Sequence, residues 1–492
     1  MAKLGIILGA FLACTAQAAG PFDVRQYGAA GDRKTLDTAA IQKAIDACAK
    51  TGGTVYFPVG DYLSGTIVLR SNVTLHLAPG ATLWGSRNIA DYDPKHLIYA
   101  KDAANIAIEG GGAINGQGDT FWDANYKALA RPSPLIELRN CRDVRIQDIM
   151  IRNAPGWTIH PKNCDRVRIR GISIINNMRG PNTDGIDPDS SRNVIISDFY
   201  IEAGDDCIVL KTTSDGSGPV QPTENVTVTN CVLITSASAL KLGTESHADI
   251  RHCVFSNCVI RGSRTGIALF AKDGGVFEGI SFSNIVMQTA PKRGQGVEWP
   301  IIIDVEKRAV DSRISRIRDV TFSDIQIYTR GRVLVEGMPE SPLERLTFRN
   351  VMMRISGFEK VEGVRKVRGG KVQRVPGVQD FGSVPAAMIF AHARDLDLRD
   401  VRVLWDAPEP APERHAIWAG QVDGLTIAGF SGRQAVRGGK VAAIHLKNSR
   451  SVSITGSRAE TGTSLFVRVD GGDPGAVLLE GNDTRGASRV RQ

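Results

Sequence analysis

The chain has 492 residues and a formal net charge of +8 at pH 7, with 60 Lys and Arg residues against 52 Asp and Glu residues. Its hydrophobic fraction of 42% is ordinary for a folded protein and excludes a wholly disordered chain. A basic protein attracts acidic partners, but no dense run of Lys and Arg is interleaved with aromatic residues. Nucleic acid is therefore the partner that we expect least, whereas an anionic membrane or an acidic polysaccharide stays open.

The N-terminus has the order of features found in a secretory signal peptide. A short basic start is followed by an apolar run, Leu4 to Cys14, that is too short to cross a bilayer with ease. Ala16-Gln17-Ala18 then fits a cleavage site built from small residues. We predict a signal peptide over residues 1–18, cut after Ala18 or one residue later, and a secreted or periplasmic protein. An uncleaved anchor is the alternative, and no other stretch is long and apolar enough to span a membrane.

A short alternating pattern recurs along the chain. The copies read roughly Asn or Asp, aliphatic, polar, aliphatic, as in Asp143-Val144-Arg145-Ile146 and Asn225-Val226-Thr227-Val228. The interval from Val144 to Val167 is 23 residues, and the next interval, to Val194, is 27 residues. Alternation over a few residues indicates strands, and repetition at this period indicates a solenoid. We therefore predict an all-β fold: a single-stranded right-handed parallel β-helix that forms one catalytic domain over residues 19–492.

A solenoid needs its ends covered, because a terminal coil would expose core side chains and a strand edge. Thr35 or Asp37 is the candidate N-cap of a covering helix over residues 37–50, and Gly52-Gly53 would end it. We place this N-terminal cap at about residues 21–65. The residues that recur at helical spacing and face the core are Ile41, Ala44, Ile45 and Cys48.

Eight cysteines occur, and seven remain once the predicted signal peptide is removed. Because seven is odd, at least one of them has no partner within the chain. Cys141 and Cys164 fall at the same place in successive repeats, and so do Cys231 and Cys258. We expect buried ladders of thiols at these positions rather than disulfides. No group of Cys and His residues has metal-ligand spacing, so we expect no metal and no cofactor.

Two segments carry more carboxylates than the turns of a repeat require. Asp184 lies in the first segment, and the pair Asp205-Asp206 lies in the second. Aligning Ile186 with Ile208 stacks Asp184 on Asp206, and neighbouring coils lie ~4.8 Å apart. Carboxyl groups packed together raise at least one pKa, which gives glycoside hydrolysis the protonated acid and the ionised base that it needs. A calcium site and a solvated turn cluster are the alternatives.

Asn182-Thr183-Asp184-Gly185 and Gly204-Asp205-Asp206-Cys207 resemble the two best-known motifs of glycoside hydrolase family 28, the polygalacturonases and their relatives. Pro155-Gly156-Trp157-Thr158-Ile159-His160, one coil earlier, is also similar to the family, and the likeness covers about residues 21 to 350. The resemblance implies inverting hydrolysis of an α-linked pectic polysaccharide or oligosaccharide that contains galacturonic acid. It further implies that Asp205 is the general acid and that Asp184 and Asp206 activate water.

The sequence departs from the family at its usual basic positions. The family's Gly-His-Gly is matched by Ala237-Ser238-Ala239, and its Arg-Ile-Lys by a stretch with Ala268 and Phe270 at the two basic positions. Lys241 lies one coil from the missing Arg in the same register, and we expect it to contact the substrate carboxylate with a second lysine assisting. The predicted substrate-binding residues are Lys241, Lys211, Lys272, Asn182, Asp187, His160, Trp157, Arg264 and Ser238.

Several functions stay open. The missing basic residues leave an exo-acting galacturonase, a rhamnogalacturonan-type hydrolase or an enzyme for another sugar. A β-helix lyase or epimerase is a second class, and a non-catalytic carbohydrate-binding β-helix is a third. A Gly-rich insertion, Lys360 to Arg374, carries six basic residues that either clamp an anionic polymer or are simply solvated. We expect a monomer whose partner is an acidic pectic polysaccharide or oligosaccharide, with no nucleic acid and no membrane span.

Overall fold

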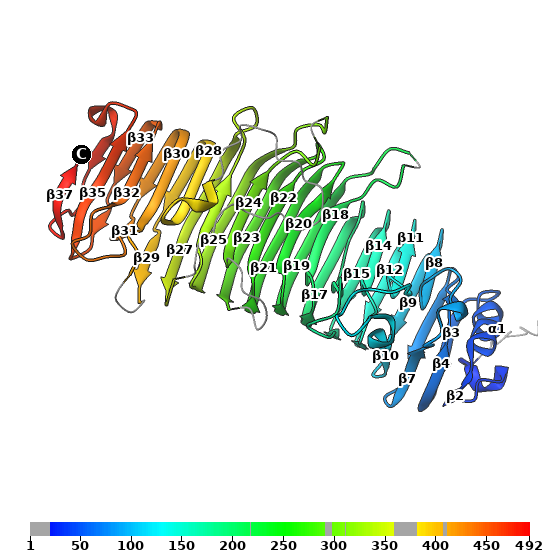
Figure 1. The fold of residues 1–492 in the computed structure, drawn as a ribbon. Coiled ribbons are helices and arrows are strands. Elements are labelled where there is room, and N and C mark those ends of the chain that lie inside the picture. Colours follow the sequence, from blue (N-terminus) through cyan, green and yellow to red (C-terminus); the bar gives the residue numbers. More distant parts are fainter. Residues whose placement is uncertain (1–19, 217, 291–297, 310, 359–380, 407–410) are drawn as a thin grey trace, which may run out of the picture.

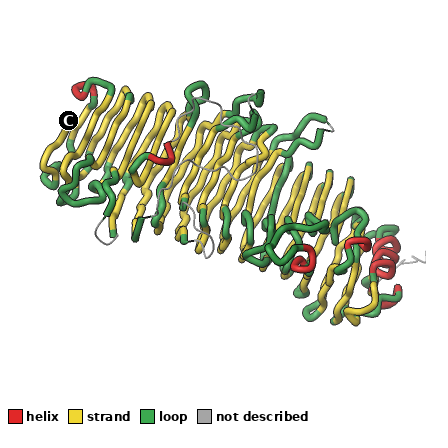
Figure 2. The backbone as a smooth tube through the Cα atoms, viewed as in Figure 1, coloured by secondary structure: helices red, strands yellow, loops and turns green. Residues whose placement is uncertain are grey.

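The protein folds into one long stack of coils (Figures 1 and 2). The computed structural model describes residues 20–216, 218–290, 298–309, 311–358, 381–406 and 411–492. The strands of successive coils pair in parallel along the stack, so the predicted parallel β-helix is confirmed. The predicted signal peptide, residues 1–18, and the basic insertion, Lys360 to Arg374, lie outside the described residues. No helix in the described part of the chain is long and apolar enough to cross a membrane.

The strands form three faces, and each face is a ladder that runs from coil to coil. Face 1 comprises β5 (Ile67–Val68), β8 (Ile98–Lys101), β11 (Ile136–Arg139), β14 (Ile159–Lys162), β18 (Ile208–Thr212), β20 (Ser238–Ser246), β22 (Thr265–Ala271), β24 (Trp299–Val305), β26 (Val333–Glu336), β32 (Ala442–Lys447), β35 (Thr463–Asp470) and β37 (Ala487–Arg491). Face 2 comprises β1 (Phe22–Asp23), β3 (Gly53–Phe57), β6 (Val73–Leu77), β9 (Ala104–Glu109), β12 (Arg142–Gln147), β15 (Asp165–Arg170), β33 (Arg450–Thr455) and β36 (Leu478–Glu480).

Face 3 is built from shorter strands, and in the middle of the stack single long strands turn the corner between faces. Face 3 comprises β2 (Asp32–Leu36), β4 (Gly60–Ser64), β7 (Ala81–Gly85), β10 (Ala113–Asn115), β13 (Met150–Arg152), β16 (Ser173–Ile175), β29 (Arg402–Trp405), β31 (Ser431–Gly432) and β34 (Arg458–Ala459). The strands that continue from face 2 into face 3 are β17 (Arg192–Ala203), β19 (Thr223–Thr235), β21 (Ile250–Ser263), β23 (Val276–Thr289), β25 (Arg316–Thr329) and β27 (Leu343–Ile355). Those that continue from face 1 into face 2 are β28 (Ala386–Arg399) and β30 (His415–Ala428).

An Asn or Asp at the head of many repeats marks the turn into face 2. Asn72, Asn193 and Asn225 have φ of 63°, 55° and 56°, in the left-handed region that Asn tolerates better than most residues. The side chains also bond along the stack: Asn225 Nδ2 donates to Asn193 Oδ1 over 3.1 Å, and Asn105 Nδ2 donates to Asn72 Oδ1 over 3.1 Å. The repeat that identifies the fold in the sequence is therefore a requirement of its turns.

The aliphatic positions of the repeat fill the interior. Val144, Val167, Val194 and Val226 pair in register and are at most 1% exposed. Further along, rings stack with centroids 4.7, 5.2 and 4.6 Å apart in the series Phe255, Phe282, Phe322 and Phe348. The seven cysteines of the described residues are buried free thiols, and the two predicted pairs lie in register on neighbouring coils.

Charged side chains alternate in sign along the outer edge of face 2, where one residue per coil pairs with the next. Arg251 pairs with Glu224 on one side and with Glu278 on the other, and its Nε lies 2.7 Å from a Glu224 carboxylate oxygen. Arg318 Nη2 lies 2.6 Å from Glu278 on the following coil. We call this series the alternating column: Arg142, Asp165, Arg192, Glu224, Arg251, Glu278, Arg318, Glu344, Arg394, Asp423 and Arg450.

The first coil is covered by α1 (Thr38–Cys48), at the N-terminal end of the stack in Figure 1. Its four predicted core residues are fully buried. Asp37 precedes the helix, but its carboxylate does not cap it; the oxygens accept from Ala30 N (2.7 Å) and Gly31 N (3.1 Å) instead. Asp37 therefore stands at the predicted N-cap position, but its carboxylate bonds to the preceding turn and not to the helix. Single helical turns occur at η1 (Val24–Tyr27), η2 (Ile89–Asp91), η3 (Gly118–Phe121), η4 (Phe381–Ser383) and η5 (Pro474–Ala476).

Candidate active site

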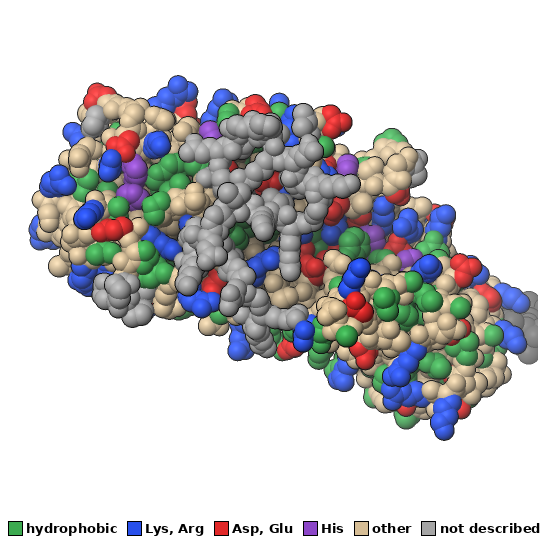
Figure 3. Space-filling model, in the orientation of Figure 1, with side chains coloured by type: hydrophobic (Ala, Val, Ile, Leu, Met, Phe, Trp, Pro, Cys, Tyr) green, Lys and Arg blue, Asp and Glu red, His purple; other side chains and the backbone are tan. Residues whose placement is uncertain are grey.

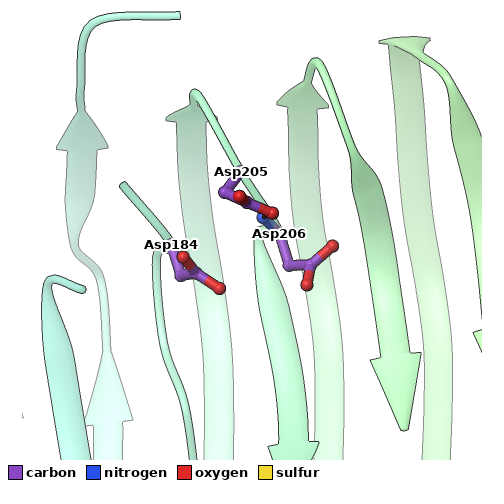
Figure 4. Close-up of side chains that lie close together, drawn as sticks. All are labelled: Asp184, Asp205 and Asp206. Carbon is purple, nitrogen blue, oxygen red and sulfur yellow. Dashed lines mark hydrogen bonds between the residues drawn. The ribbon is translucent and has the colours of Figure 1, made fainter. Parts of the chain in front are cut away.

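Two neighbouring coils of face 1 hold the aspartate cluster. Ile186 bridges to Ile208, and Gly185 N donates to Asp206 O over 2.9 Å, so Asp184 and Asp206 lie beside each other at the start of successive strands. A Cβ on Gly185 would lie 2.4 Å from Cys207 O, so this approach of the coils requires a glycine. Figure 4 shows Asp184 on one coil and the pair Asp205-Asp206 on the next.

The three carboxyl groups converge. One oxygen from each of Asp184, Asp205 and Asp206 lies within 4.8 Å of the other two. Asp184 and Asp206 are 3% exposed, whereas Asp205 is only half-buried. Like charges at this spacing in a buried place cannot all be ionised without a large cost, so the cluster must hold protons or cations.

Asp206 is the member that is held ionised. Its Oδ1 accepts the Ser238 backbone N–H over 3.0 Å, and its Oδ2 accepts Lys241 Nζ over 2.7 Å. Burial by itself would raise the pKa of Asp206, but Lys241 and Ser238 outweigh burial and hold it below the usual range. Ser238, which stands where the family has its His, therefore contributes to the site through its backbone amide.

The pKa values of Asp205 and Asp184 are raised, in contrast to that of Asp206. Burial, and next the charge of Asp206, raise the pKa of Asp205. Burial, and then the neighbouring Asp187, Asp205 and Asp206, raise the pKa of Asp184 well above its usual range. Asn182 Nδ2 lies 3.5 Å from Asp205 Oδ2, and Asp184 Oδ1 is buried without a hydrogen-bond partner. Adjacent carboxyl groups whose pKa values are shifted in opposite directions suit acid–base catalysis.

A buried lysine lies behind the cluster. Lys211 Nζ is 3.6 Å from Asp187 Oδ1, 3.3 Å from Glu245 Oε2 and 4.4 Å from the ring centroid of Trp157. Burial and nearby charges leave the pKa of Asp187 at about 7, with burial raising it and Lys211 lowering it. Trp157 is half-buried, and the ammonium group of Lys211 lies against its ring. This cation–π contact holds Trp157 beside the cluster.

His160 lies between two carboxylates. Its Nδ1 is 2.6 Å from Glu137 Oε2 and its Nε2 is 3.3 Å from Asp189 Oδ2. Burial favours the neutral ring, but Asp189 and Glu137 raise the pKa of His160 to about 9. The Trp157 and His160 rings meet edge to face with centroids 5.1 Å apart. His160 therefore supports Trp157 as a doubly protonated ring and has no free nitrogen lone pair for proton transfer.

The structure places the remaining predicted residues in different ways. Lys241 pairs in register with Ala268, as expected, but its ammonium contacts Asp206 within the cluster. Arg264 is near enough to Asp205 to oppose the rise of its pKa. Lys272 is not brought to the cluster, because its Nζ lies 2.7 Å from Glu306 on the next coil.

Sequence reasoning missed three residues around the site. Glu137 and Asp189 hold His160, and the signal for Glu137 was available, since aligning Ile136 with Ile159 puts it beside His160. Arg131 donates to Pro155 O over 2.7 Å and lies 3.3 Å from Asn182 Oδ1. Nothing in the repeat indicates Arg131, because it lies in a connection outside the repeat.

The same three carboxylates are also the group in the described residues that has the spacing to hold a cation. Calcium prefers six to eight oxygen ligands. Here one oxygen of Asp206 already accepts an ammonium and the other an amide, so the donor set fits proton chemistry better than a resident metal.

Comparisons with known proteins identify the family of the chain. The family model for glycosyl hydrolases family 28 matches residues 49–372. A probable polygalacturonase of Vitis vinifera is 29% identical over 385 residues, covering 71% of this chain and 77% of the relative. An endo-polygalacturonase of Pectobacterium carotovorum subsp. carotovorum is 27% identical over 362 residues, covering 66% of this chain and 86% of the relative.

Solved structures support the fold. The exopolygalacturonase of Thermotoga maritima has a TM-score of 0.60 at 24% identity, over 68% of this chain and 86% of that one. The family 28 exopolygalacturonase of Yersinia enterocolitica has a TM-score of 0.62 at 20% identity, over 82% and 78%. The family model covers more than half of the chain, and the aspartate motifs on which the resemblance rests lie within its range. The chain therefore belongs to glycosyl hydrolases family 28 and is a glycoside hydrolase.

Proposed function

We propose that the chain is a secreted hydrolase that cleaves α-linked galacturonic acid units of acidic pectic polysaccharide, with Asp205 as general acid. The observation that carries the proposal is the contrast between two adjacent carboxyls. Lys241, at 2.7 Å, lowers the pKa of Asp206 and favours its ionised form, whereas burial and the charge of Asp206 raise the pKa of Asp205 and favour its protonated form. Asp205 is also the more exposed of the two and can reach a glycosidic oxygen.

In this assignment Asp206 accepts the proton of the attacking water. Asp184, whose pKa is raised by burial and by its neighbours, orients that water from the preceding coil. The water attacks the anomeric carbon while Asp205 protonates the leaving oxygen.

The contacts of Asp206 support an inverting outcome. Its two oxygens both accept hydrogen bonds, from Ser238 N and from Lys241 Nζ, which suits a base that orients water better than a nucleophile that forms a glycosyl bond. The cluster's oxygens approach within 4.8 Å, closer than the ~6.5–9.5 Å usual between the carboxyls of inverting enzymes, so the product anomer is an informative measurement. We propose inversion, and NMR of the first product should then show the β-anomer.

The substrate class rests on the family and on charge. Relatives are named polygalacturonases, and the chain carries a formal net charge of +8 that favours an acidic polymer. Secretion is proposed from the signal-like start of the sequence. Relatives are named both as endo- and as exo-acting, so product length on polygalacturonate is the measurement that separates these modes.

The direct test is Asp205→Asn. We expect kcat for release of reducing ends from de-esterified polygalacturonate to fall at least ~100-fold, since loss of a general acid costs 10²–10⁴-fold. Asp311→Asn, in an exposed turn, is the matched control and should leave kcat unchanged. Equal activity of Asp205→Asn and wild type would contradict the assignment.

Two rival functions give different products. A lyase would release unsaturated sugars that absorb in the ultraviolet, and a non-catalytic binding protein would retain the polymer without releasing reducing ends. A panel of homogalacturonan, rhamnogalacturonan and xylogalacturonan identifies the backbone that is cleaved.

A further inference from the structure

Three basic side chains follow one another on face 1, on the N-terminal side of the aspartate cluster. Lys101 pairs in register with Arg139, and Arg139 with Lys162. The same line continues through Asp189 to Lys211, which lies behind the cluster. Figure 3 shows Lys, Arg and His side chains gathered on the surface over β8, β11 and β14. Three cations on successive coils therefore lie in line with the site along the axis of the stack, with Asp189 between them and Lys211.

A carboxylate of the chain itself already lies on two of these cations. The connection between β18 and β19 leaves the stack and extends toward β11 and β14 (Figure 1). Asp215 in this connection has its Oδ2 3.4 Å from Lys162 Nζ and 4.0 Å from Arg139 Nη1. The Lys162 side chain is 7% exposed, whereas that of Asp215 is 45% exposed. Lys162 and Arg139 are residues of face 1, whereas Asp215 reaches them from a connection outside the face and lies at the long end of ion-pair distances.

Lys162 and Arg139 are basic residues in a sequence that lacks the family's usual basic motif on the other side of the aspartates. The second basic residue of the family's Arg-Ile-Lys motif, the Lys, is replaced by Phe270 here. Phe270 pairs with Gly243, and Leu242 pairs with Leu210 just before the register shifts, so Phe270 lies near the line of Lys211 and Lys162. This line therefore lacks the family's Lys on the C-terminal side of the aspartates and carries Lys162 on the N-terminal side.

The outer positions of face 1 that follow Lys241 in register on the next coils carry no charge. They hold four apolar side chains, each at most 2% exposed, which belong to a separate apolar cluster packed with Phe381: Ala268, Ile302, Leu334 and Ile389. These positions offer no charged group to a substrate carboxylate, whereas Lys162 and Arg139 do so on the N-terminal side.

We propose that Lys162 and Arg139 form a subsite for a carboxylate of the uronate substrate, and that Asp215 occupies this subsite in the free enzyme. The proposal rests on the proposed function and names the part of the site that replaces the missing basic motif. Binding exchanges Asp215 for a substrate carboxylate on Lys162 and Arg139, and Arg139 Nε keeps its 2.6 Å contact with Glu137 Oε1, so no buried charge is left unpaired. Asp215 then competes with the substrate carboxylate, and its charge should weaken binding.

The test is titration calorimetry on protein carrying Asp205→Asn, with hexagalacturonate and with its methyl ester as ligands. Asp215→Asn should bind the hexagalacturonate about two- to fivefold more tightly, because a half-exposed ion pair is worth about 0.5 to 1 kcal/mol and 1.4 kcal/mol is tenfold. Lys162→Met keeps the buried stem without the charge and should bind it about fivefold more weakly. Lys43→Met, exposed on α1, removes a charge far from the subsite and should bind like its parent.

The opposite signs of the two variants distinguish a subsite from a structural contact. If Asp215→Asn binds no more tightly, or if Lys162→Met weakens the methyl ester as much as the acid, the subsite is wrong. If wild type releases no reducing ends while the affinities move as expected, the proposed function fails and the subsite stands. If Asp205→Asn still hydrolyses the ligand, the same comparison is made with KM in the wild-type background.

Discussion

The carboxyl groups of the cluster differ because an ammonium reaches one of them from the next coil. Lys241→Met removes that charge and leaves Asp206 buried, so the pKa of Asp206 should rise. The base is then protonated at pH values where wild type works. We expect the acidic limb of the kcat/KM profile to move to higher pH by about one unit or more.

The pH profile of Lys241→Arg is the control, since it keeps the positive charge and should shift less. An acidic limb that stays in place in Lys241→Met would show that Asp206 is not the base that this limb reports. If instead only KM changes, Lys241 acts on the substrate carboxylate, as the sequence suggested.

His160 makes stability depend on pH. Its pKa is raised to about 9, so its contribution is complete below the unfolded value of about 6.5 and is lost as pH rises through 9. The shift corresponds to about 3 kcal/mol. We expect the free energy of unfolding in urea to fall between pH 7 and 9.5 in wild type and to fall less in His160→Gln. Parallel pH dependence of the two proteins would contradict the ion pair.

The sequence was sufficient to predict that the aspartates lie together, but not which charged side chains contact them. Register follows from alternation, so aligning Ile186 with Ile208 was enough to stack Asp184 on Asp206. The direction of a lysine side chain depends on four torsions that the repeat does not encode. For this reason the contact of Lys241 with Asp206 appears only in the structure.

Among the elements, α1 has the clearest separate role, because it covers the open end of the stack. Ile45→Asp places a carboxylate at a fully buried position of α1, which costs about 3 kcal/mol or more. The helix should detach and expose the edge of the first coil, which can pair with another chain. We expect a lower Tm and oligomers in size-exclusion chromatography. Lys43→Asp, on the exposed side of α1, should remain monomeric with an unchanged Tm.

Elements were predictable to the extent that they repeat. A period of two residues predicted the strands and a helical period predicted α1, and the structure contains both. The connection that carries Asp215 has no period, and its return to Lys162 is a tertiary contact over more than fifty residues. The N-cap position of Asp37 was predictable, but the bonds of its carboxylate to Ala30 N and Gly31 N were not, because they are contacts with a preceding turn.

At the scale of the whole molecule, the alternating column links the coils along face 2. Arg251→Glu would place three acidic side chains in succession, with Glu224 before it and Glu278 after it. Like charges directly opposite each other on a sheet are destabilising, so we expect a loss of about 1 to 2 kcal/mol in urea unfolding. The loss should shrink in 1 M NaCl, where screening is strong. Arg251→Gln is the control and should lose less. A salt-independent effect would assign the cost to packing instead.

The alternating column also restricts how such a chain can change its length. Removing or duplicating a single coil would bring two side chains of the same sign together at the junction, whereas removing or duplicating two coils would restore the alternation. Apolar positions impose no such condition, because an aliphatic side chain packs equally well against the coil before and the coil after the change. The charge pattern therefore favours changes in the length of the β-helix between Arg142 and Arg450 that add or remove two coils at a time.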